Sequence, residues 1–169
     1  GLGFQFAPRF VRLRLYIYDT PDVMIDRLHP NARLDLRRNV RRMMENGFTC
    51  EITNDDRWFD LFYHEMYKPY AECRHGGLAR VHDYRSVRKV FHRGCGVSIK
   101  RNGEPVAGSL SYVNDGVVFN PCSGILRGDQ TLARDGASVA LYYYTIGLAY
   151  SSGIKIGDFG YSPPFLSDG

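Results

Sequence analysis

The sequence of 169 residues lacks several features that would assign a protein class directly. No run approaches 18 consecutive apolar residues, which argues against a membrane-spanning helix. Tryptophan occurs once, and neither a repeat nor a low-complexity tract is visible. Charged residues make up 24% and apolar residues 44%, a balance that excludes a disordered or collagen-like chain. The length is typical of a single domain with a sizeable core.

Cysteine is scarce and has no recognisable ligand spacing. The four thiols are Cys50, Cys73, Cys95 and Cys122, and no pair shows the C-x-x-C arrangement of zinc or redox motifs. Combinations of these residues with His75 or His92 would have non-standard spacing. The sequence therefore predicts reduced thiols, as in a cytoplasmic protein, and no metal site.

The net charge of +4 is unevenly distributed. Residues 51–73 hold two basic and six acidic side chains, whereas residues 74–101 hold eight basic and one acidic. Such a basic block could bind an anion, for example nucleic acid, a phosphate-rich cofactor or a lipid head group. A solvated helix surface with long arginine side chains is the alternative. Arg33, Arg37 and Arg41 form a further row at i, i+4 spacing and are expected to be exposed.

Hydrophobic periodicity divides the chain into short strands and helices. Alternation at period two predicts strands, and apolar positions at 3.6-residue spacing predict helices. The expected elements are a strand over 10–18, a helix over 31–46, a strand over 48–53, a helix over 57–68 that ends at Pro69, a helix over 83–94, a meander over 96–123, a helix from Asp135 or Gly136 to Ser151, and a strand over 154–159.

The segment 96–123 carries the strongest local signals. Asn102-Gly103 and Asn114-Asp115-Gly116 predict two tight turns, and therefore three antiparallel strands. Pro121, inside the third strand, indicates a bulge or an edge. The next helix and the last strand then complete a βαβ unit with parallel strands. The sequence predicts an α+β fold in which helices cover both faces of a mixed, mostly antiparallel sheet.

This order of elements, together with four short stretches, resembles the GNAT acyltransferase fold. The stretches are the basic run 31–42, the hairpin 101–108, the helix start 135–137 and the Gly-Asp-Phe-Gly-Tyr-Ser run 157–162. Within that fold the chain is most similar to the branch of Fem-type aminoacyl transferases and cellulose- or exopolysaccharide-associated (CelD-like) acetyltransferases. The resemblance implies that residues 1–30 are the tail of a preceding half, and that residues 31–169 are a GNAT-like domain truncated at its C-terminus.

The resemblance also implies a reaction. An acyl group would move from acetyl-CoA or another acyl-CoA to an amine or hydroxyl of a cell-envelope or polysaccharide precursor. An aminoacyl-tRNA-dependent peptidyl transferase is one alternative, and a catalytically idle GNAT-like binding module is another. The expected partners are an acyl donor, a small or lipid-linked envelope precursor and, in the second case, tRNA. The expected location is the cytoplasm, with peripheral contact at the inner membrane face.

Acyl transfer needs a cradle for donor phosphates, and the start of the expected helix is the candidate. Free N–H groups and a partial positive charge suit a pyrophosphate there. The expected cradle residues are Arg134, Asp135, Gly136 and Ala137. The GNAT phosphate motif is incomplete, because Ala133 and Ser138 stand where Arg or Gln and a second Gly or Ala are common. Asp135 as a simple cap and Gly136 as a packing residue are the alternatives.

The reaction also needs groups that move a proton. Asp158, at the end of the last strand, is the expected base, and Tyr161 the expected proton donor to the leaving group. The alternatives are a structural hydrogen bond for Asp158 and an ordinary half-buried tyrosine. Tyr67, Arg74 and Ser123 are expected to bind substrate. We further expect Gly136 and Asp158 to line one cleft.

Overall fold

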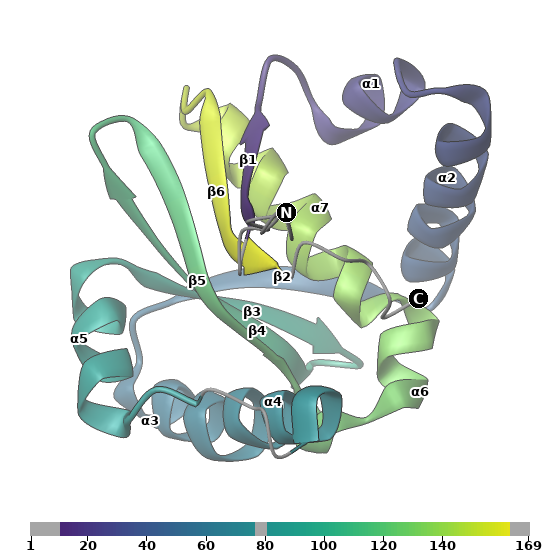
Figure 1. Cartoon of the computed structure of the whole chain (residues 1–169). Helices are drawn as coiled ribbons and strands as arrows, with labels where there is room; N and C mark the ends of the chain where they lie inside the picture. The colour runs from purple at the N-terminus through teal and green to yellow at the C-terminus, as the bar shows by residue number, and fades with distance from the viewer. Residues whose placement is uncertain (1–10, 77–80, 163–169) are drawn as a thin grey trace, which may run out of the picture.

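The computed structural model describes residues 11–76 and 81–162 (Figure 1). Its strands are β1 (Val11–Tyr16), β2 (Phe48–Thr53), β3 (Cys95–Arg101), β4 (Glu104–Asn114), β5 (Val117–Ile125) and β6 (Ile156–Ser162). Its helical elements are α1 (Pro21–Asp26), α2 (Pro30–Glu45), α3 (Asp56–Leu61), the π-helix η1 (Phe62–Tyr67), α4 (Lys68–His75), α5 (Tyr84–Arg93), the 3-10 turn η3 (Leu126–Gly128), α6 (Gln130–Leu132), the π-helix η4 (Ala133–Ala137) and α7 (Ser138–Ser151).

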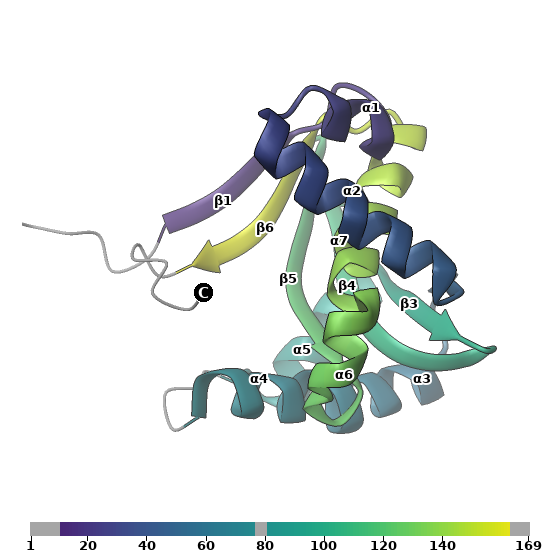
Figure 2. The same ribbon diagram turned by 90° about the vertical axis from the view of Figure 1, so that its right-hand side faces the viewer.

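The described strands form one sheet in the order β1-β6-β5-β4-β3-β2. Neighbouring strands are antiparallel, except that β5 and β6 run parallel and are joined through α7. Helices α3, α4 and α5 cover one face, while α2 and α7 lie on the other (Figures 1 and 2). This confirms the predicted α+β fold: a mixed, mostly antiparallel sheet with helices on both faces.

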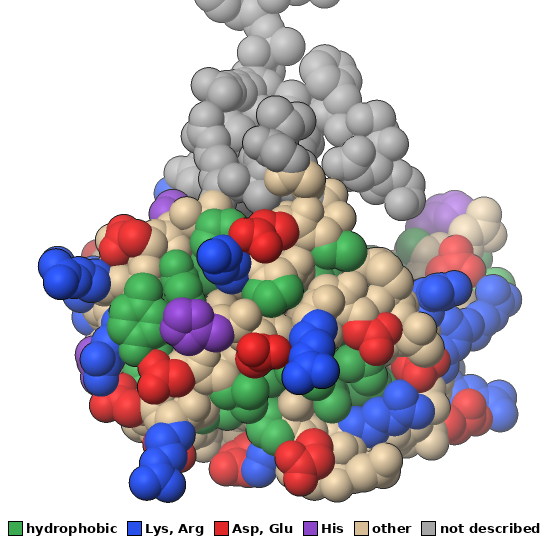
Figure 3. All heavy atoms as spheres, turned by 90° about the horizontal axis from the view of Figure 1, so that it is seen from below, with side chains coloured by type: hydrophobic (Ala, Val, Ile, Leu, Met, Phe, Trp, Pro, Cys, Tyr) green, Lys and Arg blue, Asp and Glu red, His purple; other side chains and the backbone are tan. Residues whose placement is uncertain are grey.

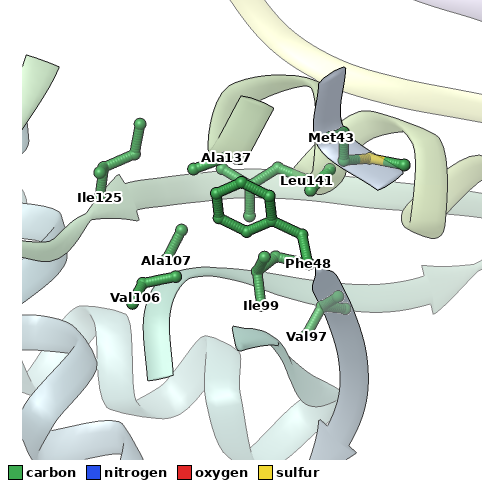
Figure 4. Close-up of a cluster of buried hydrophobic side chains, with 10 residues drawn as sticks. Met43, Phe48, Val97, Ile99, Val106, Ala107, Ile125, Ala137 and Leu141 are labelled. Atoms are coloured by element: carbon green, nitrogen blue, oxygen red, sulfur yellow. The ribbon is translucent and has the colours of Figure 1, made fainter. Parts of the chain in front are cut away.

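The core beneath α7 is built from the apolar positions of the central strands (Figure 4). The ring of Phe48 lies against Ala137 and Leu141, with Ile99 beside it. Met43 of α2 closes one side and is fully buried. Each large side chain buried in this way contributes about 1.5–3 kcal/mol. This core fixes α2 and α7 on the sheet.

The core on the opposite face is aromatic. Trp58 of α3 stacks on Phe62 with a ring separation of 5.2 Å. The indole lies directly on the sheet at Gly96 and Gly108, where an added Cβ would come within 2.2 Å and 2.7 Å of its ring. Side chains at these positions would lift α3 from the strands, so the two glycines set the spacing of this layer.

The two predicted turns of the meander are confirmed. Asn102 and Gly103 have φ of 54° and 85°, and Asp115 and Gly116 have φ of 49° and 72°. Positive φ at both central residues gives the twist that a two-residue hairpin turn requires. The three expected strands are present as β3, β4 and β5.

The predicted helix end at Pro69 is wrong. Helix α3 continues into η1, and η1 continues into α4, which contains Pro69 and extends to His75. The Lys68 N–H reaches the Tyr63 carbonyl, five residues back, as in a π-helical turn. Pro69 follows this π-turn directly and lies inside the continuous helix. Such π-turns are frequent at functional sites.

Candidate functional site

Strands β5 and β6 pair over only a short stretch before they separate. The pairs are Val117–Ile156, Val118–Gly157 and Phe119–Asp158. Beyond them β5 stays beside β4 as far as Ile125, whereas β6 stays beside β1 as far as Ser162. Figure 2 shows β6 and β1 swinging away from β5. We call this opening, between residues 120–125 and 159–162, the β5–β6 wedge.

A bulge lies at the apex of the wedge. The register shifts between Leu110 and Tyr112 of β4, so that Asn120 and Pro121 of β5 bulge out. The bulge indicated by Pro121 is thus confirmed. Asn120 donates a hydrogen bond through Nδ2 to Oγ1 of Thr145 in α7, at 3.4 Å. Bulges often re-aim groups beside active sites, and this one ties the apex to the overlying helix.

Helix α7 forms one wall of the wedge. The ring of Tyr142 packs against Phe159 of β6 with a centroid distance of 5.5 Å and an angle of 58°. Removal of water by the surrounding protein raises the pKa of Tyr142, Tyr70 raises it further, and Arg74 opposes the shift. Half of the Tyr142 side chain is nevertheless exposed. Tyr70 and Arg74 of α4 therefore act electrostatically on an accessible phenol of α7.

Helix α4 forms the facing wall because η1 approaches β5 very closely. A Cβ on Gly124 would lie 2.4 Å from the carbonyl carbon of Met66. Arg74 donates a hydrogen bond through Nη1 to the Tyr70 hydroxyl at 3.4 Å. Within the described part of the chain Arg74 makes no ion pair with a carboxylate. The wedge mouth thus holds two phenols and an arginine that makes no ion pair among the residues described.

The predicted substrate residues lie in two places. Arg74 stands at the wedge mouth, and half-buried Ser123 lies on β5 beyond the bulge, opposite Ser109 of β4. Tyr67 is buried, and its hydroxyl accepts a hydrogen bond from the His82 N–H at 3.2 Å. Burial raises the pKa of Tyr67 to about 12. The structure brings Arg74 and Ser123 to the wedge and places the Tyr67 hydroxyl inside the α3–α5 layer.

Asp158 stands at the apex and is 3% exposed. Its Oδ2 lies 2.5 Å from Nε of Arg12 and 3.3 Å from Nε of Arg14, both on β1. Its Oδ1 accepts a hydrogen bond from the Gly160 N–H at 3.1 Å. Arg12 also lies over the ring of Phe119, 5.7 Å from its centroid, so the group joins β1, β6 and β5. These contacts fit the alternative in which Asp158 makes structural hydrogen bonds, and a role of Asp158 as base stays a prediction.

Asp158 and Gly136 do not face one another. Gly157 and Phe159 point to the α7 face, since a Cβ on Gly157 would meet the Phe159 ring and Ile17. Side chains alternate along a strand, so Asp158 points to the other face. Tyr161 is paired with Arg12 through the backbone, and its side chain lies outside the described residues.

The helix expected to start at Asp135 or Gly136 starts earlier, at Gln130. Asp129 caps it, accepting hydrogen bonds from the N–H groups of Thr131 at 2.7 Å and Leu132 at 3.3 Å. The chain stays helical through η4 into α7, with a kink at Gly136, where φ is 124°. Asp129 is the stronger start signal because its carboxylate caps two N–H groups.

The four predicted cradle residues are engaged within the chain. A Cβ on Gly136 would lie 2.8 Å from Cα of Met43, so α2 already occupies the close approach. Asp135 pairs with Arg101 at 2.8 Å, and the Arg134 carbonyl accepts from Arg42 at 3.0 Å. Ala137 is buried in the core. These residues do not fit the pyrophosphate of acyl-CoA, and we derive no step from that cofactor.

An apolar groove adjoins the wedge. It has a volume of about 460 Å³ and lies between α1, α2, α7 and β1. Its lining includes Leu15, Ile25, Val40 and Ile146, and Tyr142 belongs to both the groove and the wedge. The groove is therefore an apolar extension of the candidate site.

The acidic block of the sequence neutralises part of the basic block. Arg88 pairs with Asp56 at 3.1 Å, and Lys100 pairs with Glu51. The face drawn in Figure 3 accordingly mixes acidic and basic side chains. This favours the solvated-surface alternative for the basic block.

The arginine row of α2 is exposed only in part. Arg37 and Arg41 are exposed as predicted, and each forms an ion pair within its own surface region. Arg33 is half-buried, because its Nη1 donates to the Asp26 carbonyl at 3.2 Å.

Sequence reasoning missed Tyr70, Tyr142 and Asn120. Tyr70 comes after Pro69, where the helix was expected to have ended. Tyr142 lies in a helix that is apolar nearly all round, so no single face distinguished it. The proline beside Asn120 was the available signal for the apex.

A membrane-spanning helix and a metal site are both absent from residues 11–76 and 81–162. None of their helices is long and apolar enough to cross a bilayer. Nor do three or more of their His, Cys, Asp and Glu side chains gather closely enough to hold a metal ion.

Solved structures share this fold at low sequence identity. L-PGS from Bacillus licheniformis aligns over 95% of this chain, with a TM-score of 0.58 and 13% identity. The C-terminal domain (DUF2156) of a protein described as a lysylphosphatidylglycerol synthetase, from Agrobacterium fabrum, aligns over 92%, with a TM-score of 0.52 and 12% identity. The chain spans 49% of the length of each. A GCN5-related N-acetyltransferase from Kribbella flavida, at a TM-score of 0.39, is too distant to support an argument.

Comparison with protein-family models and with curated proteins gives no match. The likeness to solved structures therefore concerns the fold alone.

Proposed function

We propose that this chain is the transferase domain of a longer protein, and that it moves an acyl or aminoacyl group onto an envelope lipid or lipid-linked acceptor. The observation that carries the proposal is the β5–β6 wedge, where two parallel strands part beside Arg74, Tyr70 and Tyr142. Ligands of α/β sheets bind where the carboxyl ends of strands separate. The fold likeness to proteins named for lysylphosphatidylglycerol synthesis supports a lipid acceptor.

The groove and the wedge together suit an acceptor with an apolar part and a polar part. Acyl chains would occupy the groove of about 460 Å³, and the reacting head group would lie at Tyr142, where groove and wedge meet. Helix α2 lines the groove through Leu36 and Val40, and its exposed arginines support peripheral contact with the inner face of a membrane.

The transfer step makes one bond and breaks one. The acceptor oxygen or nitrogen attacks the acyl carbon, the bond from that carbon to the donor's ester oxygen breaks, and the acceptor proton passes through a base or water to the leaving oxygen. Negative charge develops on the acyl oxygen, and donors held in place stabilise it. Arg74 and the phenol of Tyr142 are two donors at the opening. A tyrosine phenol is protonated at neutral pH, and burial raises the pKa of this one further.

For the donor we favour an aminoacyl ester of tRNA over acyl-CoA, because the expected phosphate cradle is filled by α2. The test incubates the longer protein with phosphatidylglycerol vesicles and either labelled lysyl-tRNA or labelled acetyl-CoA. Label in the lipid from lysyl-tRNA supports the proposal, and label only from acetyl-CoA would reverse the choice of donor. Absence of label from both would count against a transferase of this kind.

A binding module without catalysis is the second candidate. It is favoured because the Asp158 carboxylate already contacts Arg12, Arg14 and the Gly160 N–H, and these contacts leave it poorly placed to accept a proton. Such a module would retain binding to phosphatidylglycerol vesicles and transfer no label.

A further inference from the structure

A second pocket lies on the α3 face of the sheet, near the β2 edge and apart from the wedge. It has a volume of about 310 Å³ and shares no lining residue with the groove beside α7. Trp58, Leu61 and Pro105 supply its apolar surfaces, and Ser98 of β3 contributes to its floor. The fold therefore offers a separate small cavity.

Two hydrogen-bond donors are buried at this pocket. Trp58 is 7% exposed and Ser98 is 1% exposed. Neither the Trp58 Nε1–H nor the Ser98 hydroxyl has a hydrogen-bond partner among the described residues. Buried polar groups are nearly always satisfied, so two unsatisfied donors at one pocket indicate a missing acceptor.

The rim of the pocket carries no net charge. Lys100 forms an ion pair with Glu51, and the Asp55 carboxylate accepts from the backbone N–H of Arg57 at 2.9 Å. Two cations and two carboxylates line the rim, so the rim offers no net opposite charge to a charged ligand. The Lys100–Glu51 pair is partly exposed and such pairs hold weakly, so the rim can open to admit a ligand.

We infer that this pocket binds a small uncharged molecule with an amide or ester carbonyl and an apolar body. The carbonyl oxygen accepts hydrogen bonds from Trp58 Nε1 and from the Ser98 hydroxyl. The apolar body packs against the indole, Leu61 and Pro105. Binding involves no covalent step and does not depend on the transfer reaction proposed for the wedge.

The test uses the single tryptophan of the chain, whose indole N–H gives one resolved NMR signal. Hexanamide is the probe; hexanoate has the same chain with a charge, and hexylammonium has the chain without an acceptor. Hexanamide should shift the Trp58 indole signal in a saturable manner, and hexylammonium should leave it in place. An unmoved signal with hexanamide, or equal shifts with hexylammonium or hexanoate, would overturn the inference.

Two serine variants supply the matched control. Ser98→Ala should weaken hexanamide binding by about three- to tenfold, because one neutral hydrogen bond is lost. Ser111→Ala removes another buried, unpartnered hydroxyl of the same sheet, but one that lines a different pocket, and should leave the affinity unchanged. Equal affinity in the wild type and Ser98→Ala would contradict the assignment.

Discussion

The substitution Asp158→Asn distinguishes a structural ion pair at Asp158 from a role of Asp158 as catalytic base. It keeps the size of the side chain and removes the charge that meets Arg12 at 2.5 Å and Arg14 at 3.3 Å. Loss of one partner of a buried ion pair typically costs 3–5 kcal/mol; we expect the lower end, about 3 kcal/mol, because both arginines are partly exposed and can regain water. In a chain of this length that loss lowers the Tm by about 6–12 °C.

Urea unfolding and a thermal scan measure the effect. Arg14→Ala is the control: this arginine is 52% exposed, and its loss should cost at most about 1 kcal/mol. If Asp158→Asn changes the free energy of unfolding by less than about 0.5 kcal/mol, a stabilising role for the ion pairs of Asp158 is refuted. A base would instead lose turnover by about 100-fold at unchanged stability.

Three further predictions concern packing and thiols. Gly124→Ala should destabilise the fold by about 3 kcal/mol in urea unfolding, because its Cβ would meet the Met66 backbone at 2.4 Å. Gly147→Ala, whose nearest neighbour would be 3.7 Å away, should instead stabilise α7 by up to about 1 kcal/mol. Burial raises the pKa of Cys50 and Cys122 to about 11, so a maleimide at pH 8 should label exposed Cys73 well before either. A thiol in the unfolded chain has a pKa of about 8.5, so the unfolded state loses these protons at lower pH than the folded state does. The free energy of unfolding should therefore fall as the pH rises from about 8.5 toward 11. Rapid labelling of Cys122, or a free energy of unfolding that stays constant over that pH range, would contradict the burial of these two thiols.

The meander could be predicted because its signals are local. Asn-Gly and Asp-Gly turns need positive φ, and few other conformations suit them. The end of the helix at Pro69 could not, because the π-turn of η1 depends on how closely β5 and η1 pack at Gly124. That packing is a tertiary effect and leaves no periodicity in the sequence.

The candidate site was predicted only in part for the same reason. The charged segment that begins at Arg74 predicts a substrate contact there; the structure puts Arg74 at the wedge mouth, and its role in binding stays a prediction. Gly136 was taken for a ligand contact because a glycine before a helix permits close approach, but the approaching backbone is α2. A glycine in the sequence indicates that another group approaches the backbone closely, but the sequence does not identify that group.

The substitution Arg74→Ala tests most directly whether the wedge is the place of transfer. Label transferred from lysyl-tRNA to phosphatidylglycerol should fall by roughly 10- to 150-fold, because a hydrogen bond from a charged group is worth about 1.5–3 kcal/mol. Arg85→Ala, which removes an exposed arginine from α5, should transfer label at the wild-type rate. Equal rates for Arg74→Ala and the wild type would contradict the wedge as the site of transfer.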